Sequence, residues 1–439
     1  MSDIRTRSIF ETDFYIALAA ISLLVIGILF VYSSGINSLG ELTNTEYIRQ
    51  IIWAITGLML MFAITFTDYR IFERSAVLIY LAMIGLLILT LMFGRVVNGA
   101  RRWIGIGPLA AQPSEFMKVA LIIFLSRYYN RRRVHAHKLR IFVGGLLLTL
   151  IPAGLVLMQP DLGSAIVYMP IFLVIAYFGG AKPMHIGILI ITGSLFLLLT
   201  VLPFWQQHLT HRALPIVGVL TDFRSLQILM VGIGIAAAFS TAGWFLTSKP
   251  SFRWVLYFLT ILLLTLPAAY FARQVLRDYQ IMRLVVFIDP YIDPRGAGWN
   301  IIQSTTAVGS GGIAGKGFLQ GTQSHFQFLP AQSTDFIFSI LAEEWGFVGV
   351  FVVFALIMII VWRSLFVMLS AREPFAAYLA SGVVALFGAH FIVNVGMTIG
   401  MMPVTGLPLL LLSFGGSSVW TALISLGLVM SVYQHRYQY

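Results

Sequence analysis

Long apolar segments alternate with short polar ones along the whole chain. Each approaches about 20 residues with few charges, the length that an α-helix needs to cross a bilayer. The period-two alternation of a membrane β-barrel is absent. The pattern therefore predicts an all-α polytopic membrane protein with about 12 transmembrane helices. Their expected cores are 13–34, 49–67, 74–93, 112–129, 140–158, 162–179, 184–203, 226–247, 253–272, 335–362, 376–399 and 409–433.

Lysine and arginine residues gather in alternate loops, and this bias orients the predicted helices. Short basic loops stay in the cytoplasm, so we expect both termini and these loops on that side. The residues are Arg5, Arg7, Arg70, Arg74, Arg131, Arg132, Arg133, Lys138, Arg140, Lys182, Lys249, Arg253, Arg363, Arg372 and Arg436. The long segments 35–48, 94–111, 204–225 and 273–334 then lie outside.

The segment 273–334, which precedes the tenth predicted helix, is too long to be a mere connector. Its amphipathic start, Arg273 to Ile288, is expected to lie along the outer membrane surface. The glycine run from Gly309 to Gly317 lacks the strand, spacing and following helix of a nucleotide-binding P-loop.

The amino-acid composition narrows the possible classes of protein further. Hydrophobic residues make up 59% of the chain and charged residues 10%, which excludes a soluble globule. Cysteine is absent, so disulfides and thiol chemistry are excluded. The net charge of +11 favours anionic lipids or substrates over nucleic acid, because the basic residues sit in short loops. The N-terminus shows no cleavage pattern of a signal peptide, so we expect the first span to remain as an anchor.

Asp335 is the most informative single residue, because it stands where the long outer segment meets an apolar helix. An ionisable group at the mouth of a membrane helix is costly and indicates a functional site. The alternative is that Asp335, together with Thr334, only caps that helix.

The segment 94–111, which is expected to lie outside, contains arginines and is therefore an exception to the rule that basic loops stay in the cytoplasm. Arg95, Arg101 and Arg102 precede Trp103 there. The planar fork of arginine matches phosphate oxygens, so these residues suit an anionic substrate, while Trp103 suits stacking on a sugar. The alternative is a structural patch against lipid headgroups.

Two further acidic positions stand at expected outer helix ends. Glu115 and Lys118 are three residues apart and share a helix face. They either form an ion pair that only helps to bury both, or also present the ammonium to a phosphate. Asp161 opens another helix, where it caps that helix or contributes to the site.

Other polar residues within spans have a structural interpretation. Glu343 and Glu344 need partners at their depth, and we expect a structural polar network around them. His390 and Asn394, four residues apart, are expected to form interhelical hydrogen bonds. No cluster has the spacing of metal ligands.

Taken together, these residues resemble the SEDS family, the shape, elongation, division and sporulation proteins of bacteria. The resemblance covers most of the chain and is closer to the elongation-type members than to the division-type members, on account of Pro408. It departs from the family pattern at Ala331, at Phe414 and in an extra hairpin at 204–275. The motifs are Arg101–Trp103, Gln112–Glu115 with Lys118, Gln159–Gly163, Thr334–Phe338, Ala342–Glu344, Asn394–Gly396, Gly400–Pro408 and Ser413–Ser418.

This resemblance implies a peptidoglycan glycosyltransferase in the bacterial cytoplasmic membrane, a single polytopic domain over 1–439. It would polymerise lipid II, the undecaprenyl-pyrophosphate-linked disaccharide pentapeptide, into β-1,4 glycan strands on the outer face for rod-shape elongation. Asp335 would be the catalytic base, and Arg101, Arg102, Trp103, Glu115, Lys118 and Asp161 would bind substrate.

The implied partners are a class B penicillin-binding protein and rod-complex components, and no cofactor is implied, although dependence on a divalent cation stays open. Three alternatives remain: a flippase for lipid-linked precursors, a division-type polymerase and a scaffold that only anchors partners. We expect the extra hairpin to be dispensable for the chemistry, because its helix cores carry no charge.

Overall fold

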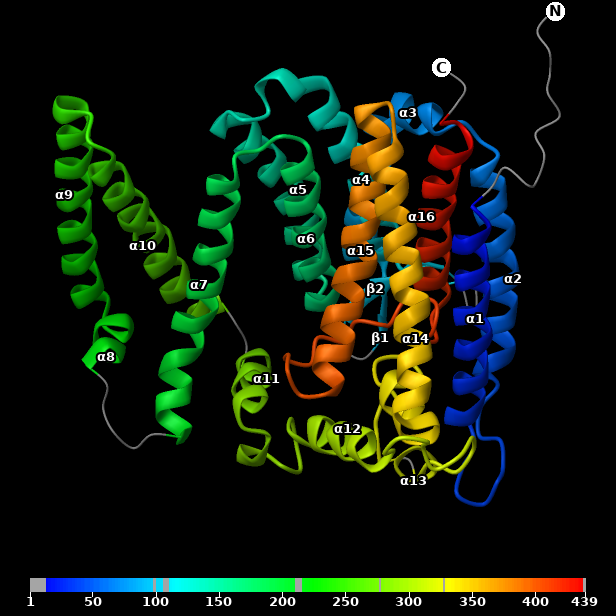
Figure 1. Ribbon diagram of the computed structural model, residues 1–439. Helices are drawn as coiled ribbons and strands as arrows, with labels where there is room; N and C mark the ends of the chain where they lie inside the picture. Colours follow the sequence, from blue (N-terminus) through cyan, green and yellow to red (C-terminus); the bar gives the residue numbers. More distant parts are fainter. Residues whose placement is uncertain are drawn as a thin grey trace, which may run out of the picture. The chain divides into compact units, whose positions relative to one another are not determined.

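The computed structural model describes residues 13–97, 100–105, 110–209, 215–275, 278–326 and 328–436, and its regular structure is almost entirely helical (Figure 1). Arg5 and Arg7 of the expected cytoplasmic N-terminus lie outside these residues. The chain divides into two compact units, Met1–Ala181 with Gln303–Tyr439, and Lys182–Ile302.

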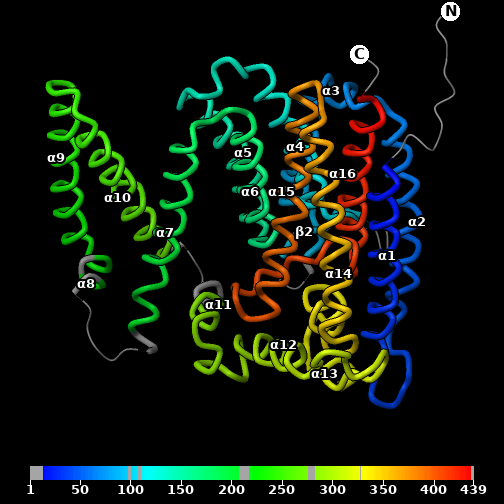
Figure 2. Tube along the Cα trace, in the orientation of Figure 1, coloured from blue at the N-terminus to red at the C-terminus, as the bar shows by residue number. Residues whose placement is uncertain are grey.

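The first unit is a bundle of long helices with the N-terminal and C-terminal parts of the chain interleaved. In it α16 packs on α2, α14 packs on α1 and α15, and α4 packs on α3, α6 and α15 (Figure 2). The helices are α1 (Phe14–Ser34), α2 (Glu46–Thr65), α3 (Tyr69–Phe93), α4 (Pro113–Arg132), α5 (Leu139–Met158), α6 (Leu162–Phe178), α14 (Ile337–Ser370), α15 (Pro374–Thr398) and α16 (Gly416–Gln434), with a short 3₁₀ turn η3 (Arg133–His135) after α4.

Burial separates central from peripheral helices in this unit. In the most apolar stretch of each helix, 83% of residues are buried in α16 and 67% in α15, against 22% in α3. The outward side chains of α3 are large and apolar, such as Leu78 and Leu81. A helix that exposes such a surface is stable in a bilayer, where lipid tails cover it.

The expected helices form in all twelve places, but the number of membrane spans is not confirmed as twelve. Among the described residues, ten helices are long and apolar enough to cross a bilayer. Helix α4 carries Glu115, Lys118 and Arg127 in its span, and α6 has only 17 residues. The last helix begins at Gly416 rather than near residue 409, because residues 403–415 are not helical.

The predicted all-α class is confirmed, and the residues outside the long helices add a short hairpin and further helices. Strands β1 (Arg95–Val97) and β2 (Ala100–Trp103) pair as an antiparallel hairpin. The long segment before α14 contains α12 (Trp299–Ser310) and α13 (Thr322–His325). In α12, the hydroxyl of Ser304 donates to the carbonyl of Thr398, 2.7 Å away, which holds the segment against the end of α15.

The second unit contains α7 (Pro183–Leu209), α8 (Pro215–Thr221), α9 (Phe223–Thr247), α10 (Pro250–Val275), α11 (Asp278–Ile288) and the 3₁₀ turn η4 (Pro290–Ile292). Helices α9 and α10 form a hairpin in which the Ser240 hydroxyl donates to the Phe252 carbonyl at 2.7 Å. Leu199, Leu226 and Leu266 join α7, α9 and α10 in one apolar cluster. The helices of the expected extra hairpin are therefore present, and its dispensability stays a prediction.

Helix α14 is broken one third of the way along at Gly346, where φ is 59° and ψ is −158°. The loop before α13 enters this break. Its backbone amides at Lys316 and Gly317 donate to the carbonyls of Glu343 and Glu344, each at 3.0 Å. The break thus exchanges helical hydrogen bonds for bonds to the loop, which satisfies the freed carbonyls.

We predict that Gly346→Ala destabilises the protein. Only glycine adopts this backbone conformation readily, and a strained residue costs about 1–3 kcal/mol. An added Cβ would also lie 2.3 Å from the backbone nitrogen of Gly315. Thermal unfolding in detergent checks this. Gly85→Ala is the matched control, because Gly85 lies within α3 with open space around it. Equal midpoints for both variants would contradict the account.

Candidate active site

The non-helical residues 403–415 between α15 and α16 form the centre of the candidate site. Two side chains of α15 bond to their backbone. Asn394 Nδ2 donates to the Leu407 carbonyl at 2.7 Å, and His390 Nδ1 lies 2.8 Å from the Pro408 carbonyl. Because a carbonyl only accepts, His390 Nδ1 carries the proton here and Nε2 is left as an acceptor. Both residues therefore bind the connecting backbone, and His390 also makes the expected interhelical bond, to Lys118 of α4 at 3.0 Å.

Asp335 lies in a turn before α14 and does not occupy its capping position. The capping position is Phe336, and no side chain caps it. The Asp335 amide donates to the Ala331 carbonyl at 3.0 Å, and the Asp335 carbonyl accepts from Asn394 Nδ2 at 2.9 Å. The carboxylate lies beside Gly406, where an added Cβ would come within 3.3 Å of Oδ2. Asn394 therefore ties the Asp335 turn to residues 403–415.

The turn that presents Asp335 depends on a strained residue. Ala331 has a φ of 50°, a left-handed conformation that is uncommon for residues with a side chain. This conformation directs its carbonyl at the amides of Thr334 and Asp335, at 3.2 and 3.0 Å. Such strain persists where the surroundings hold it in place, and here Gln332 Nε2 donates to the Ser34 carbonyl at 2.8 Å.

Arg102 and Asp161 meet where β2 reaches the start of α6. Their closest atoms are 3.8 Å apart, and Arg102 also donates to the carbonyls of Gln159 and Pro160. Asp161 caps α6 by accepting from the Ser164 amide at 3.3 Å. It also accepts from Gln112 Nε2 at 2.8 Å. Asp161 is therefore a helix cap and the partner of an arginine at once, so both interpretations hold together.

Lys118 is fully buried and faces the interior of the bundle. Its ammonium lies 2.6 Å from Glu115 Oε1 and 3.0 Å from His390 Nε2. The predicted Glu115–Lys118 pair is confirmed. Glu115 Oε1 also accepts from the Ser164 hydroxyl at 3.4 Å, whereas Glu115 Oε2 has no hydrogen-bond partner among the described residues. The ammonium thus has no exposed surface in this structure.

Close backbone packing joins these groups. A Cβ on Gly163, in the first turn of α6, would lie 2.7 Å from the Thr405 carbonyl oxygen. The start of α6, which Asp161 caps, therefore touches the same residues that border Asp335. Arg101 and Trp103 lie on β2, where Arg101 is exposed and Trp103 is half-buried opposite Arg95.

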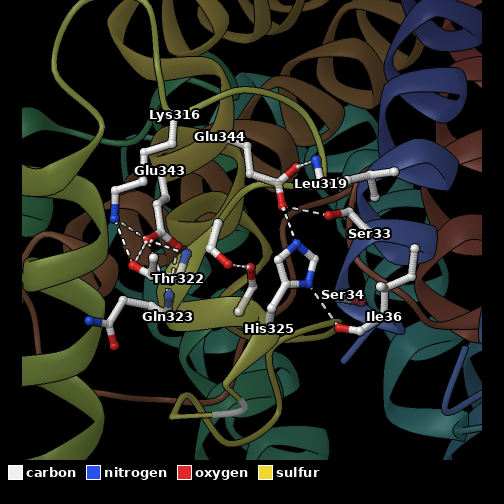
Figure 3. Close-up of polar contacts among 12 residues, drawn as sticks. Ser33, Ser34, Ile36, Lys316, Leu319, Thr322, Gln323, His325, Glu343 and Glu344 are labelled. Atoms are coloured by element: carbon white, nitrogen blue, oxygen red, sulfur yellow. Dashed lines mark hydrogen bonds and ion pairs between the residues drawn. The ribbon is translucent and has the colours of Figure 1, made fainter. Parts of the chain in front are cut away.

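A second polar cluster surrounds Glu343 and Glu344, which are both fully buried (Figure 3). Glu343 Oε1 lies 2.6 Å from Lys316 Nζ and accepts from the Thr322 amide at 2.9 Å. Glu344 Oε1 accepts from the Ser33 hydroxyl at 2.5 Å and lies 3.9 Å from His325 Nε2. The expected polar network is confirmed, and it fastens the long loop to α1 and α14.

Several members of these clusters could not be found from the sequence. His390 was expected to bond between helices, but its pairing with Lys118 had no signal in the spacing. Ser33 reaches Glu344 across 311 positions of the chain. Ser164, by contrast, follows the Gln159–Gly163 motif directly, so the sequence could have indicated it as a residue of the candidate site.

Comparison with known proteins identifies the family of the chain. The FtsW/RodA/SpoVE family, described as cell cycle proteins, matches residues 14–212 and 204–438. The chain belongs to this family. It is 44% identical to the peptidoglycan glycosyltransferase RodA of Treponema pallidum (strain Nichols) over 98% of this chain and 99% of that protein. It is 31% identical to the peptidoglycan glycosyltransferase MrdB of Escherichia coli (strain K12), over 95% of this chain and 92% of that protein.

Two solved structures share the fold. One, from work described as "Structural coordination of polymerization and crosslinking by a peptidoglycan synthase complex", has a TM-score of 0.65 at 28% identity and covers 98% of this chain and 99% of that chain. The other is the rod shape determining protein RodA of Thermus thermophilus, with a TM-score of 0.59 at 26% identity over 98% of each chain.

We predict that Lys118→Met and Glu115→Gln destabilise the protein by much more alone than in combination. Each single change leaves a buried charge without its partner, which typically costs about 3–5 kcal/mol. A double-mutant cycle measured by thermal unfolding gives the coupling energy. The matched control is Arg70→Gln with Glu373→Gln, a partly exposed pair on α3 and before α15, whose coupling should stay below about 1 kcal/mol. Strictly additive effects at Lys118 and Glu115 would argue against a coupled buried pair.

Proposed function

We propose that the protein is a peptidoglycan glycosyltransferase that polymerises lipid II into β-1,4 glycan strands for rod-shape elongation. The observation that carries this proposal is its similarity, over nearly the full length, to RodA of Treponema pallidum and MrdB of Escherichia coli. The groups proposed for the chemistry are Asp335, on a fixed turn, as the base, and Arg102 and Lys118, in the neighbouring cluster, as cations.

Asp335 is the base in this proposal. The acceptor sugar presents a 4-hydroxyl, which is a weak nucleophile until a group within hydrogen-bond reach takes its proton. The carboxylate is half-buried, so it can meet a substrate, and two backbone hydrogen bonds hold its turn in place. Attack from the face opposite the pyrophosphate inverts the anomeric carbon in one step.

Cations stabilise the departing pyrophosphate. Arg101 is exposed and Arg102 partly exposed, so both can face an anionic donor, and Trp103 beside them is suited to stack on a sugar. Lys118 acts from behind as a buried positive charge that Glu115 holds in place. Asp161 fixes the guanidinium of Arg102. A pyrophosphate leaves without protonation by a second carboxylate, which a glycoside hydrolase would need.

A lipid-linked precursor flippase is the alternative from another class. A transporter carries polar groups along a path between both faces of the membrane. The two polar clusters described above border the first two turns of α4, α6 and α14, at the N-terminal ends of these helices. This one-sided arrangement favours an enzyme that works at one membrane face.

We place that face outside the cell and both termini in the cytoplasm. One side for both termini is supported by Tyr15 near the start of α1, which lines the same cavity as Tyr433 and Arg436 at the end of α16. A class B penicillin-binding protein is the proposed partner, which the similarity to a peptidoglycan synthase complex supports.

We predict that Asp335→Asn abolishes polymerisation while the protein stays folded. Asparagine preserves the shape of the side chain but cannot take a proton, and loss of a positioned base costs about 10²–10⁴-fold in rate. Polymer from lipid II, resolved by gel, is the measurement. Asp289→Asn is the matched control, because Asp289 only caps η4 and asparagine caps equally well. Normal turnover by Asp335→Asn would remove the base from the mechanism.

We predict that a cysteine at Gly309 is labelled from outside the cell and one at Arg131 only from inside. The chain has no cysteine of its own. Gly309 is exposed on α12 with open space for a side chain, and Arg131 is exposed at the end of α4. Labelling of intact cells with a membrane-impermeant maleimide checks this. The reverse pattern would overturn the orientation.

A further inference from the structure

The buried cluster around Glu343 and Glu344 has no part in the proposed chemistry, although it lies on the helix that follows Asp335 (Figure 3). Both carboxylates are fully buried near the start of α14. Burial of a charged group costs free energy unless hydrogen bonds or an ion pair compensate for it. The partners of the two carboxylates therefore show which segments the cluster holds together.

Glu343 fastens the long outer segment to α14. Among the described residues, the partners of its carboxylate all belong to that segment. Oε1 lies 2.6 Å from Lys316 Nζ, accepts from the Thr322 hydroxyl at 2.8 Å and accepts from the Gln323 amide at 3.1 Å. None of these bonds reaches α1.

Glu344, by contrast, reaches the end of α1 (Figure 3). Its Oε1 accepts from the Ser33 hydroxyl at 2.5 Å, and its Oε2 accepts from the Leu319 amide at 3.1 Å. His325 Nε2 lies 3.9 Å from the same Oε1. On its other side His325 Nδ1 donates to the Ile36 carbonyl at 2.9 Å, because a carbonyl only accepts. Glu344 and His325 together hold the end of α1 in place.

The end of α1 in turn holds the segment that presents Asp335. The carbonyl of Ser34 accepts from Gln332 Nε2 at 2.8 Å. Gln332 belongs to the turn in which the Asp335 amide donates to the Ala331 carbonyl at 3.0 Å. Ser33 and Ser34 are adjacent and both buried, so a displacement of one also moves the other. A continuous path of contacts therefore runs from the buried cluster through α1 to Asp335.

The turn responds to such a displacement because it is strained. Ala331 has a φ of 50°, and strain of this kind persists only where the surroundings hold it. Gln332 anchors the turn to α1, and Asn394 of α15 anchors it through the Asp335 carbonyl at 2.9 Å. Loss of an anchor lets the strained turn relax, which moves the carboxylate from a position that a base must keep within hydrogen-bond reach.

We propose that Ser33, His325 and Glu344 are positioning residues for the Asp335 turn, which they hold through the end of α1. Their part in catalysis rests on the proposed function. Loss of a link in this path should lower kcat and leave KM nearly unchanged, because the exposed contacts proposed for the substrate lie on β2. The path should also protect the turn from opening, whether or not the chain polymerises lipid II.

Three variants of the full chain separate this path from the rest of the cluster. Ser33→Ala removes the hydroxyl that donates to Glu344. Gln332→Met removes the donor to α1 and keeps the length of the side chain. The matched control is Thr322→Val, which removes a hydroxyl that binds Glu343 in the same cluster but outside the path.

Two measurements are made on each variant. Hydrogen exchange of the Thr334 and Asp335 amides, which donate within the turn, is read by mass spectrometry, and kcat and KM are measured with lipid II. We expect Ser33→Ala and Gln332→Met each to raise exchange and to lower kcat by about threefold to tenfold, because one hydrogen bond of the path is lost. The double variant should match the single ones, because both changes break the same path. The control should resemble the wild type in both measurements.

Exchange in the turn that is the same in Ser33→Ala as in the control would overturn the proposal. Effects of the two links that multiply in the double variant would also overturn it, and so would faster exchange with an unchanged kcat. A wild-type chain that makes no polymer would contradict the proposed function alone, and the exchange measurement would still decide whether the path exists. If Ser33→Ala does not fold, His325→Phe, which removes the bond to Ile36, replaces it in both measurements.

Discussion

Residues 403–415 must satisfy the hydrogen bonds of a non-helical backbone inside a bundle of membrane helices, and the rest of the first unit is arranged around that need. An unsatisfied backbone group in hydrocarbon costs several kcal/mol. Side chains and backbone groups from other segments provide the missing partners. Gln50 of α2 donates to the Ser413 carbonyl at 3.1 Å, and the Phe414 amide donates to the Ser333 carbonyl at 2.9 Å.

The same bonds produce the geometry of the candidate site. Asn394 uses one amide group for two carbonyls, those of Leu407 and Asp335. The backbone that needs a donor and the turn that presents the carboxylate are thereby held by one side chain. Glycine at position 406 leaves room for the Asp335 carboxylate, and glycine at position 163 lets α6 approach the same backbone.

The buried Lys118 follows from this arrangement as well. His390 donates from Nδ1 to the Pro408 carbonyl, so its Nε2 must accept, and the Lys118 ammonium is the donor beside it. Glu115 on the other side gives the ammonium an anionic partner at 2.6 Å in the interior of the bundle. A buried charge is thus placed behind the site by the backbone rather than by the substrate. We regard this as the reason that a buried lysine in the second turn of α4 is tolerated.

Features of the fold and the site that depend on residues close together in the sequence were predictable, whereas features that depend on residues far apart in the sequence were not. The positions of the helices follow from the apolar runs, and the Glu115–Lys118 contact follows from a spacing of three on one helix. The helix expected from residue 409 was wrong at its start, because Leu409–Leu412 reads as a helical run but Leu411 has a φ of 69°. The bonds that override the local pattern come from Gln50, His390 and Asn394, and a local pattern carries no signal for them.

The β1–β2 hairpin and the break at Gly346 differ in this respect. Asn98 and Gly99 stand between the two strands in the sequence, and an Asn-Gly pair is a local hairpin signal that could have been read. Gly346 reads as an ordinary glycine in an apolar run, but the loop at Gly315 occupies the space that a side chain would need. A long-range contact, which the sequence does not display, therefore decides the break at Gly346.

The central claim is that this single chain carries the complete polymerising site. The most direct test incubates the purified protein with lipid II alone in detergent and resolves the products by gel electrophoresis. The account predicts glycan strands linked β-1,4 without any partner protein. A folded protein that makes no strands, yet moves lipid II across the bilayer of a sealed vesicle, would contradict it and favour a transporter.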